Sequence, residues 1–231
     1  MKTLIASCVL LLVAVGAQGQ WKFELVAGPS LTTFTGGEKK DWGGTGTNPK
    51  LVLRGNLGFR VDRLLSEKFL AGGGIVFALK GTAYQGDVNY YNQATNNLET
   101  LKVKYNKVLS YVDVPVYVKY VASDKIKLLA GLQPSFLLSA KIKNDKNART
   151  AYPSLAKTED AKDYYTGFDL AFLLGPQYTI SEKVAVQMLV NPGLLKMAKA
   201  EEYVNEGELK ERKFKVNNTT VSFTIVYFIG Q

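Results

Sequence analysis

Apolar and polar residues alternate strictly in several stretches of this chain. The clearest stretch is residues 110–120, where valine occupies every second position from Val112 to Val118. The positions between the valines hold polar or aromatic residues and a proline, among them Asp113 and Pro115. A period of two residues is that of a β-strand with one apolar and one polar face. The pattern therefore predicts a strand here. Whether the apolar or the polar face of this strand lies on the outside of the protein depends on the rest of the sequence.

The same period recurs along the chain and predicts eight strands. They cover residues 23–33, 51–61, 69–79, 110–120, 126–142, 164–174, 184–191 and 221–229. Short connections (62–67, 122–125 and 179–183) alternate with long polar ones (about 35–50, 81–107, 143–163 and 197–213). Short periplasmic turns and long outer loops are typical of a transmembrane barrel, whereas such loops are uncommon inside a compact soluble domain. We therefore predict an all-β fold: an eight-stranded antiparallel up-and-down transmembrane β-barrel with short periplasmic turns and long, mobile extracellular loops.

A soluble β-sandwich or a lipocalin-like cup would also show alternating strands, but it would bury the apolar faces. The polar faces of this chain hold small residues such as Gly72 and Gly131, and isolated charges of both signs. A soluble surface is usually denser in Lys and Glu, whereas the lumen of an eight-stranded barrel has room only for side chains. Charges inside such a lumen need partners. We predict a structural charge network that fills the lumen, formed by Glu24, Arg54, Arg60, Asp113, Lys119, Lys127 and Asp169.

The first residues have the pattern of a secretory signal peptide: Lys2, an apolar stretch at 4–15 and the small-x-small sequence at 17–19. Residues 5–8 resemble a lipoprotein cleavage box, but the apolar stretch continues past Cys8, which favours the ordinary signal. Beyond the signal no stretch has the length of a spanning helix, so strands would have to cross the membrane. We predict a cleaved signal peptide at 1–19, a barrel domain at 20–231, and location in the outer membrane of a Gram-negative bacterium.

The amino-acid composition excludes several kinds of catalytic and metal-binding site. The chain has no histidine, and its one cysteine, Cys8, is removed with the signal. Ser-His and Asp-His catalytic arrangements, thiol nucleophiles and cysteine-based metal sites are therefore excluded. Asp113 and Asp169 could form a carboxylate pair, but their basic neighbours favour ion pairing instead. We predict no enzymatic activity, no cofactor and no metal site.

Two further patterns carry no chemistry. The glycine-rich stretches at 43–46 and 72–74 do not open a helix after a strand, so they do not predict a phosphate site. We expect a loop at the first and a bend or close packing of the barrel wall at the second. Residues 160–163 hold too few acidic side chains for a calcium site.

The net charge of +9, which becomes +8 without Lys2, suggests anionic partners. The basic residues are scattered among acidic ones in predicted loops of an exported protein, so nucleic acid is not an expected partner. We expect contact with outer-membrane lipid and lipopolysaccharide, and protein partners at the loops or turns. The mean hydropathy of −0.04 agrees with a barrel, in which the two faces of each strand average out.

Pro115 is unusual because it removes a hydrogen-bond donor from a strand that reads as central. A bulge or a locally opened ladder would accommodate it. We expect Pro115 to face the lumen beside Asp113.

The sequence Tyr-Val-Asp-Val-Pro-Val-Tyr-Val-Lys-Tyr at 111–120 resembles the fourth strand of a family of small outer-membrane β-barrel proteins that includes PorT-like proteins. The likeness continues at 131–135 (Gly-Leu-Gln-Pro-Ser), at 168–176 and at 27–32 (Ala-Gly-Pro-Ser-Leu-Thr), and it covers essentially the whole mature chain. The chain ends differently, in Tyr-Phe-Ile-Gly-Gln, without the terminal aromatic residue of many outer-membrane proteins. The resemblance implies an outer-membrane barrel and adds a role in protein secretion to the possible functions.

Three functions stay open at this point. The first is a non-enzymatic structural or interaction protein that acts through its outer loops. The second is a PorT-like component of a protein secretion machine, and the third is a pore for small solutes. Protein partners would favour the second, and a lumen without salt bridges would favour the third.

Overall fold

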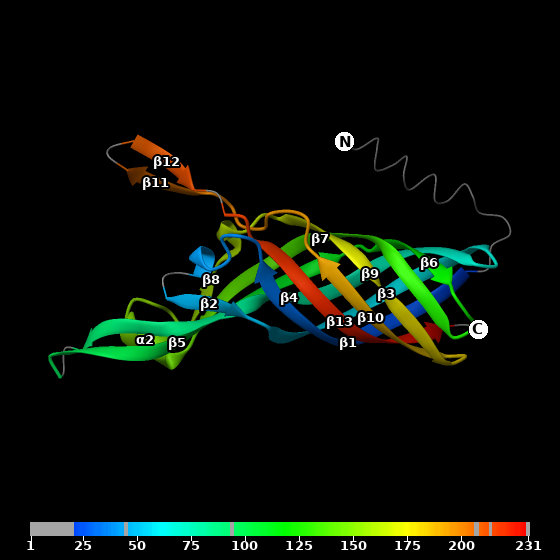
Figure 1. The fold of residues 1–231 in the computed structure, drawn as a ribbon, viewed down its shortest axis with the longest axis horizontal. Helices are drawn as coiled ribbons and strands as arrows, with labels where there is room; N and C mark the ends of the chain where they lie inside the picture. The colour runs from blue at the N-terminus through cyan, green and yellow to red at the C-terminus, as the bar shows by residue number, and fades with distance from the viewer. Residues whose placement is uncertain (1–20, 44–45, 93–94, 206–207, 213, 230–231) are drawn as a thin grey trace.

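A computed structural model of the chain describes residues 21–43, 46–92, 95–205, 208–212 and 214–229. The predicted signal peptide at 1–19 lies outside these residues. Within them, antiparallel strands close into a ring of eight strand positions (Figure 1). In ring order these are β1 (Trp21–Thr35), β3 (Val52–Ser66), β4 (Phe69–Asn92), β5 (Asn97–Asp113) continued by β6 (Val116–Val121), β7 (Ile126–Asn144), β9 (Phe168–Ser181), β10 (Val184–Pro192) and β13 (Asn217–Ile229). The pairing of β1 with both β3 and β13 closes the ring.

The side chains of the ring alternate between an apolar outside and a mainly polar inside. On the two neighbouring strands β1 and β3, Leu25 and Leu57 are 44% and 62% exposed, whereas Glu24 and Arg60 are only 1% and 2% exposed. An apolar outer wall around a polar interior is the arrangement of a barrel that is surrounded by lipid. The predicted fold class, an eight-stranded antiparallel barrel, is confirmed.

The fourth strand position is divided between β5 and β6 at Val114 and Pro115. The ladder opens there: the Val114 N–H donates to the Pro134 carbonyl (2.8 Å), and the Gly74 N–H donates to the Pro115 carbonyl (3.1 Å). Pro115 is buried and lines a cavity inside the barrel together with Asp113. The expectation that Pro115 faces the lumen at an opened ladder is therefore confirmed.

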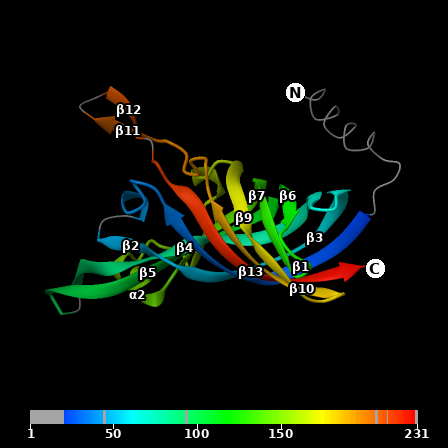
Figure 2. The same ribbon diagram turned by 45° about the vertical axis from the view of Figure 1, so that its right-hand side comes forward.

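The two ends of the barrel differ in size (Figures 1 and 2). The short turns, the start of β1 and the end of β13 lie at one end, which we call the inner end. The long connections lie at the other, outer end, as predicted, and they contain regular elements of their own. These are η1 (Asp41–Gly43), β2 (Thr47–Lys50), α2 (Lys146–Ala151), β8 (Thr158–Asp160), η2 (Lys162–Tyr164), β11 (Glu201–Asn205) and β12 (Glu208–Arg212). Among the described residues, no helix combines the length and the apolar character needed to cross a membrane.

Three predicted boundaries are wrong. The third strand does not end at residue 79: β4 and β5 continue outward as one hairpin, paired from Val76↔Asp113 to Asn92↔Asn97, through the predicted loop at 81–107. Residues 62–66 belong to β3 rather than to a turn. Tyr164 belongs to η2, and β9 begins only at Phe168.

A strict period of two predicts that Gln133, Ser135, Ser139 and Lys141 share the polar, inward face of the strand at 126–142, and this is wrong at the outer end of the strand. The register of β7 against β5 shifts between Ser110 and Tyr111, where the partner changes from Ser139 to Leu137. Such a bulge moves the following side chains to the opposite face. Ala140 is therefore buried, and Lys141 is exposed rather than in the lumen.

Candidate functional site: a packed lumen beneath an outer cap

Four charged side chains fill the lumen near the inner end, and we call them the inner ion-pair cluster: Glu24, Arg60, Asp62 and Lys119. Glu24 lies directly opposite Arg60 on the neighbouring strand, and its carboxylate accepts contacts from Arg60 (2.8 Å) and from the Lys119 ammonium (2.5 Å). The same ammonium lies 2.5 Å from the Asp62 carboxylate. The four side chains are at most 3% exposed. Two positive and two negative charges thus neutralise one another away from water.

Tyr117 and Gly72 complete this layer. The Tyr117 hydroxyl donates to Asp62 (2.9 Å), and the Arg60 and Lys119 cations both lie 5.4 Å from the centre of its ring. A methyl group at Gly72 would lie 2.2 Å from the Asp62 carboxylate and 2.6 Å from the Tyr117 ring. Gly72 therefore leaves the space that the Asp62–Tyr117 pair occupies, which is the close packing expected for the 72–74 glycines.

A second ion pair joins Lys80 and Asp113 further out along the lumen. The Lys80 ammonium lies 2.9 Å from the Asp113 carboxylate and donates to the Ser135 hydroxyl (2.9 Å). The Gln133 amide donates to Asp113 (2.8 Å) and accepts from Asn191 (3.2 Å). Side chains from four strands are thereby joined in one hydrogen-bonded layer.

Asp169 lies next to this layer and is 1% exposed. Its carboxylate accepts hydrogen bonds from the Asn218 amide (3.0 Å) and from the Leu170 N–H (2.8 Å). The Asn218 amide also contacts the Tyr111 hydroxyl at 3.4 Å, so Asp169 is linked to the outer end of the barrel through amide and phenol groups.

A cavity of about 50 Å³ lies between the two charged layers. It is lined by groups from both of them, including Arg60, Lys80, Asp113 and Gln133. One water molecule needs roughly 10–15 Å³ of such volume, so the cavity has room for a few waters and for little else. The lumen is therefore packed, with polar side chains at these two layers and a small cavity between them.

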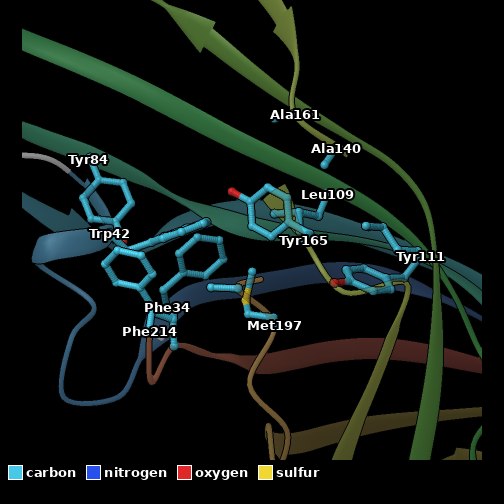
Figure 3. Close-up of a cluster of buried hydrophobic side chains, with 13 residues drawn as sticks. Phe34, Trp42, Tyr84, Leu109, Tyr111, Ala140, Ala161, Tyr165, Met197 and Phe214 are labelled. Carbon is cyan, nitrogen blue, oxygen red and sulfur yellow. The ribbon is translucent and has the colours of Figure 1, made fainter. Parts of the chain in front are cut away.

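Aromatic side chains close the outer mouth of the barrel. The cluster, which we call the aromatic cap, consists of Phe34, Trp42, Tyr84, Leu109, Tyr111, Leu137, Ala140, Ala161, Tyr165, Met197, Ala198, Phe214 and Val216. Figure 3 shows the rings of Phe34, Trp42 and Tyr165 turned toward one another. The Trp42 ring lies 4.8 Å from Phe214 and 5.9 Å from Tyr165, and Phe34 lies 6.3 Å from Tyr84. Spacings of 4.5–7 Å are those of attractive aromatic pairs.

Two polar side chains at the aromatic cap, Lys107 and Tyr84, donate to backbone carbonyls of the loop that carries Trp42. The Lys107 ammonium donates to the Trp42 carbonyl (2.8 Å) and lies 5.0 and 4.9 Å from the centres of the Trp42 and Tyr84 rings. The Tyr84 hydroxyl donates to the Lys39 carbonyl (2.5 Å). Burial raises the pKa of the Tyr84 and Tyr165 hydroxyls above the ordinary tyrosine value.

The seven charged residues predicted to form one lumen network lie in different places. Glu24, Arg60 and Lys119 belong to the inner ion-pair cluster, Asp113 pairs with Lys80, and Asp169 bonds with Asn218. Arg54 instead donates to the Asn106 side chain (2.6 Å) at the outer end. The Lys127 ammonium lies over the Phe228 ring, 5.5 Å from its centre.

Two members of the ion pairs, Asp62 and Lys80, were not predicted from the sequence. Both fall just outside the predicted strand limits, in residues assigned to a turn and to a loop edge. Each continues the inward alternation of its strand, Asp62 two positions after Arg60 and Lys80 two positions after Ala78. Extending the period of two by one residue pair would have found them.

The charged side chains of the lumen are paired with one another or with amide groups. Within the part of the chain that the structure describes, no three His, Cys, Asp or Glu side chains gather so that they could hold a metal ion. The buried carboxylates are held by cations and amides, and histidine is missing from the whole sequence.

The chain is similar to several proteins of known structure, and one family of proteins matches most of it. No curated protein matches the chain. Solved structures with similar folds include the Neisserial surface protein A (10% identity, TM-score 0.48, covering 89% of this chain and 96% of that one) and the attachment invasion locus protein Ail of Yersinia pestis bound to the heparin analogue sucrose octasulfate (11%, 0.44, 92% and 100%). Outer Membrane Protein W of E. coli is a third (15%, 0.41, 92% and 100%). The profile of the family described as "Outer membrane protein beta-barrel domain" matches residues 16–199, which is most of the chain. The protein therefore belongs to this family of outer-membrane β-barrel proteins.

Proposed function

We propose that the protein is a non-enzymatic structural or interaction protein of the Gram-negative outer membrane, exported by a signal peptide that is cleaved near residue 19, and that it acts through its outer elements. One observation carries the proposal: the lumen is filled and capped, while the outer end is built up into regular elements with a core of their own. Because the lumen is closed, a partner can reach the protein only from outside the barrel. The ordered outer elements offer the largest surface for such a contact.

Exposed lysines on one outer segment support contact with anionic lipopolysaccharide. Lys141 and Lys143, at the outer end of β7, and Lys146, at the start of α2, are all exposed. Asp145 between them is engaged as the helix cap, where its carboxylate accepts from the Ala148 N–H (2.7 Å). Basic residues next to a membrane surface attract anionic headgroups.

Charge reversal tests this contact. The triple variant Lys141→Glu, Lys143→Glu, Lys146→Glu should lose most lipopolysaccharide binding in a titration of the detergent-solubilised barrel at low salt. A matched control reverses Lys68, Lys125 and Lys183, which are equally exposed but lie in the inner turns. The control should bind as the unmodified protein does. Equal binding by both variants would contradict the proposed contact.

A PorT-like role in a protein secretion machine is the second candidate. The alternating strand at 111–120, with Asp113 and Lys119 in buried ion pairs, is the feature that supports the resemblance. The native protein, extracted in mild detergent, would then co-purify with secretion subunits in fixed stoichiometry. A barrel that purifies alone would argue for the first candidate.

The third candidate, a small-solute pore, is disfavoured by the packed lumen and its cavity of about 50 Å³. We expect no stepwise conductance from the protein in a planar lipid bilayer. Regular conductance steps of the unmodified protein would instead make the pore the leading candidate function.

A further inference from the structure

A groove of about 410 Å³ crosses the lipid-facing wall of the barrel over β1, β13, β10 and β9. Its lining includes Pro29, Phe223, Met188 and Pro176, all of which are exposed on the outside of the wall. Met188 pairs with Phe223 in the β10–β13 ladder. The registers on either side place Pro29 opposite Phe223 and Pro176 opposite Met188. One side chain from each of four adjacent strands thus follows the floor and rims of the groove.

Two Gly-Pro pairs produce this depression. Gly28-Pro29 and Gly175-Pro176 interrupt the ladders on the two sides of the β10–β13 pair, because proline has no N–H to donate. A methyl group at Gly28 would lie 2.0 Å from the Phe223 carbonyl, and one at Gly175 would lie 1.9 Å from the Met188 carbonyl. The strands therefore approach one another closely at both places. The two Gly-Pro pairs thus lie on the two sides of the groove, with Met188 and Phe223 between them.

The groove runs obliquely through the apolar band. On β1 the outward apolar residues extend from Phe23 to Leu31, and Pro29 lies in the outer half of that stretch. On β9 they extend from Phe168 to Ile180, and Pro176 lies in the inner half. The groove therefore crosses the middle of the membrane, where only hydrocarbon can occupy it.

Tyr178 marks the inner end of the groove. It lines the groove and is 45% exposed, and it pairs with Ile126, the first residue after the short turn at 122–125. Tyrosines at this depth sit at the membrane interface, with the hydroxyl among the polar groups of the lipid. A lipid whose headgroup lies in the inner leaflet can pass Tyr178 and continue into the groove.

We propose that this groove is a binding site for one acyl chain of an inner-leaflet phospholipid. A chain in the groove touches side chains on several sides, whereas a chain against a convex barrel wall touches them on one side only. Each added contact is small, but their sum favours the groove over bulk lipid. A second barrel is a poor occupant, because its convex wall cannot enter the depression.

Photolabelling in vesicles tests the site. The full protein is reconstituted with phosphatidylethanolamine that carries a diazirine in the middle of one acyl chain, irradiated, and analysed by mass spectrometry. Label should concentrate on Met188, Phe223 and their neighbours rather than on the outward residues of β4 and β7. An even spread over all outward positions would overturn the proposal, as would disulfide-linked dimers of a Met188→Cys variant in the same vesicles.

A matched pair of variants sharpens the test. Val186→Trp places a large ring in the groove, and Val118→Trp places the same ring on the wall away from it; the two valines are 40% and 44% exposed. The first should lose the preferred labelling and the second should keep it. Val186→Phe and Val118→Phe serve as a milder pair if tryptophan impairs folding. Preferred labelling that survives a filled groove would refute the site.

Discussion

Inside the barrel the buried side chains include the charged Glu24, Arg60 and Lys119, whereas at the outer mouth they include the aromatic Phe34, Trp42 and Tyr165. Both sets are almost fully buried. The difference follows from what surrounds each region. Lipid around the barrel draws most apolar side chains outward, so the interior holds charges that must pair, together with small apolar clusters such as Val26 with Phe228 and Leu129 with Leu173. Beyond the membrane water surrounds the strands, and the ordinary rule of an apolar interior returns.

The hairpin of β4 and β5 passes through both regions and shows the change within one element. Lys80 ends the charged part of β4, and Tyr84, two inward positions later, already belongs to the aromatic cap. On β5, Asp113 lies in the lumen and Leu109 in the aromatic cap. The medium that surrounds the strands, lipid or water, therefore determines which side chains are buried at that height of the barrel. Substitutions in the lumen and in the aromatic cap test the two cores separately.

The largest effect should come from Lys119→Met. This change leaves Glu24 and Asp62 buried with one cation between them, and breaking a buried ion pair typically costs about 3–5 kcal/mol. Denaturant unfolding of the reconstituted barrel measures the loss in free energy of unfolding. Lys125→Met, in an exposed turn, is the control and should change stability by less than about 0.5 kcal/mol. A loss from Lys119→Met as small as that of the control would mean that the cluster does not stabilise the barrel.

Phe34→Ala should open the aromatic cap and leave the barrel intact. Removing a fully buried phenylalanine costs about 3–5 kcal/mol, but here the loss falls on the outer elements alone. Limited proteolysis from outside should cleave the connections at 36–50 and 158–166 faster, while hydrogen exchange in the barrel strands stays slow. The lipid-facing Phe136→Ala provides the comparison and should leave outer cleavage unchanged. Faster exchange throughout the barrel would show that the two cores unfold as one.

Gly72→Ala should destabilise the lumen by about 1–3 kcal/mol, the usual cost of overpacking a core. Its methyl group would press on Asp62 and Tyr117. At Gly55, on the adjacent strand β3, an added methyl group meets only an ordinary contact at 3.7 Å, so Gly55→Ala serves as the matched variant. Thermal unfolding that ranks Gly55→Ala as the more harmful change would contradict the packing described for this layer.

An effect that is absent at neutral pH concerns alkaline pH and the aromatic cap. Because burial raises the pKa of Tyr84 and Tyr165, these groups keep their protons when folded, while in the unfolded cap they ionise near pH 10. Their contribution is complete below pH 10 and decreases above it, by about 1.4 kcal/mol per tyrosine for each pH unit. Outer proteolysis should therefore accelerate near pH 11. A Tyr84→Phe, Tyr165→Phe double variant should weaken this acceleration; an unchanged acceleration would assign the effect to other groups.

The alternation of Val112, Val114, Val116 and Val118 recurs in seven further stretches and, together with the short and long connections and the polar faces of the strands, predicted the barrel. Lipid on one side and a narrow lumen on the other enforce this period of two. The same rule predicted an inward-facing Pro115. It could not predict the outer part of β4, because both faces of that strand are covered there and Thr82, Ala83 and Tyr84 are all buried. The period of two also could not predict the aromatic cap, because its residues come from distant segments and meet only through tertiary contacts.

The aromatic cap combines residues from the two ends of the chain, and this has a consequence for how the barrel is assembled in the cell. Phe34 comes from the first strand and Phe214 and Val216 from just before the last, and Met197 donates its N–H to the Val216 carbonyl (2.9 Å). The cluster can therefore assemble only once β1 and β13 have met. Resistance of the outer elements to protease would then show that the barrel has closed. In pulse-labelled cells, the time at which this resistance appears would give the time at which β1 and β13 pair.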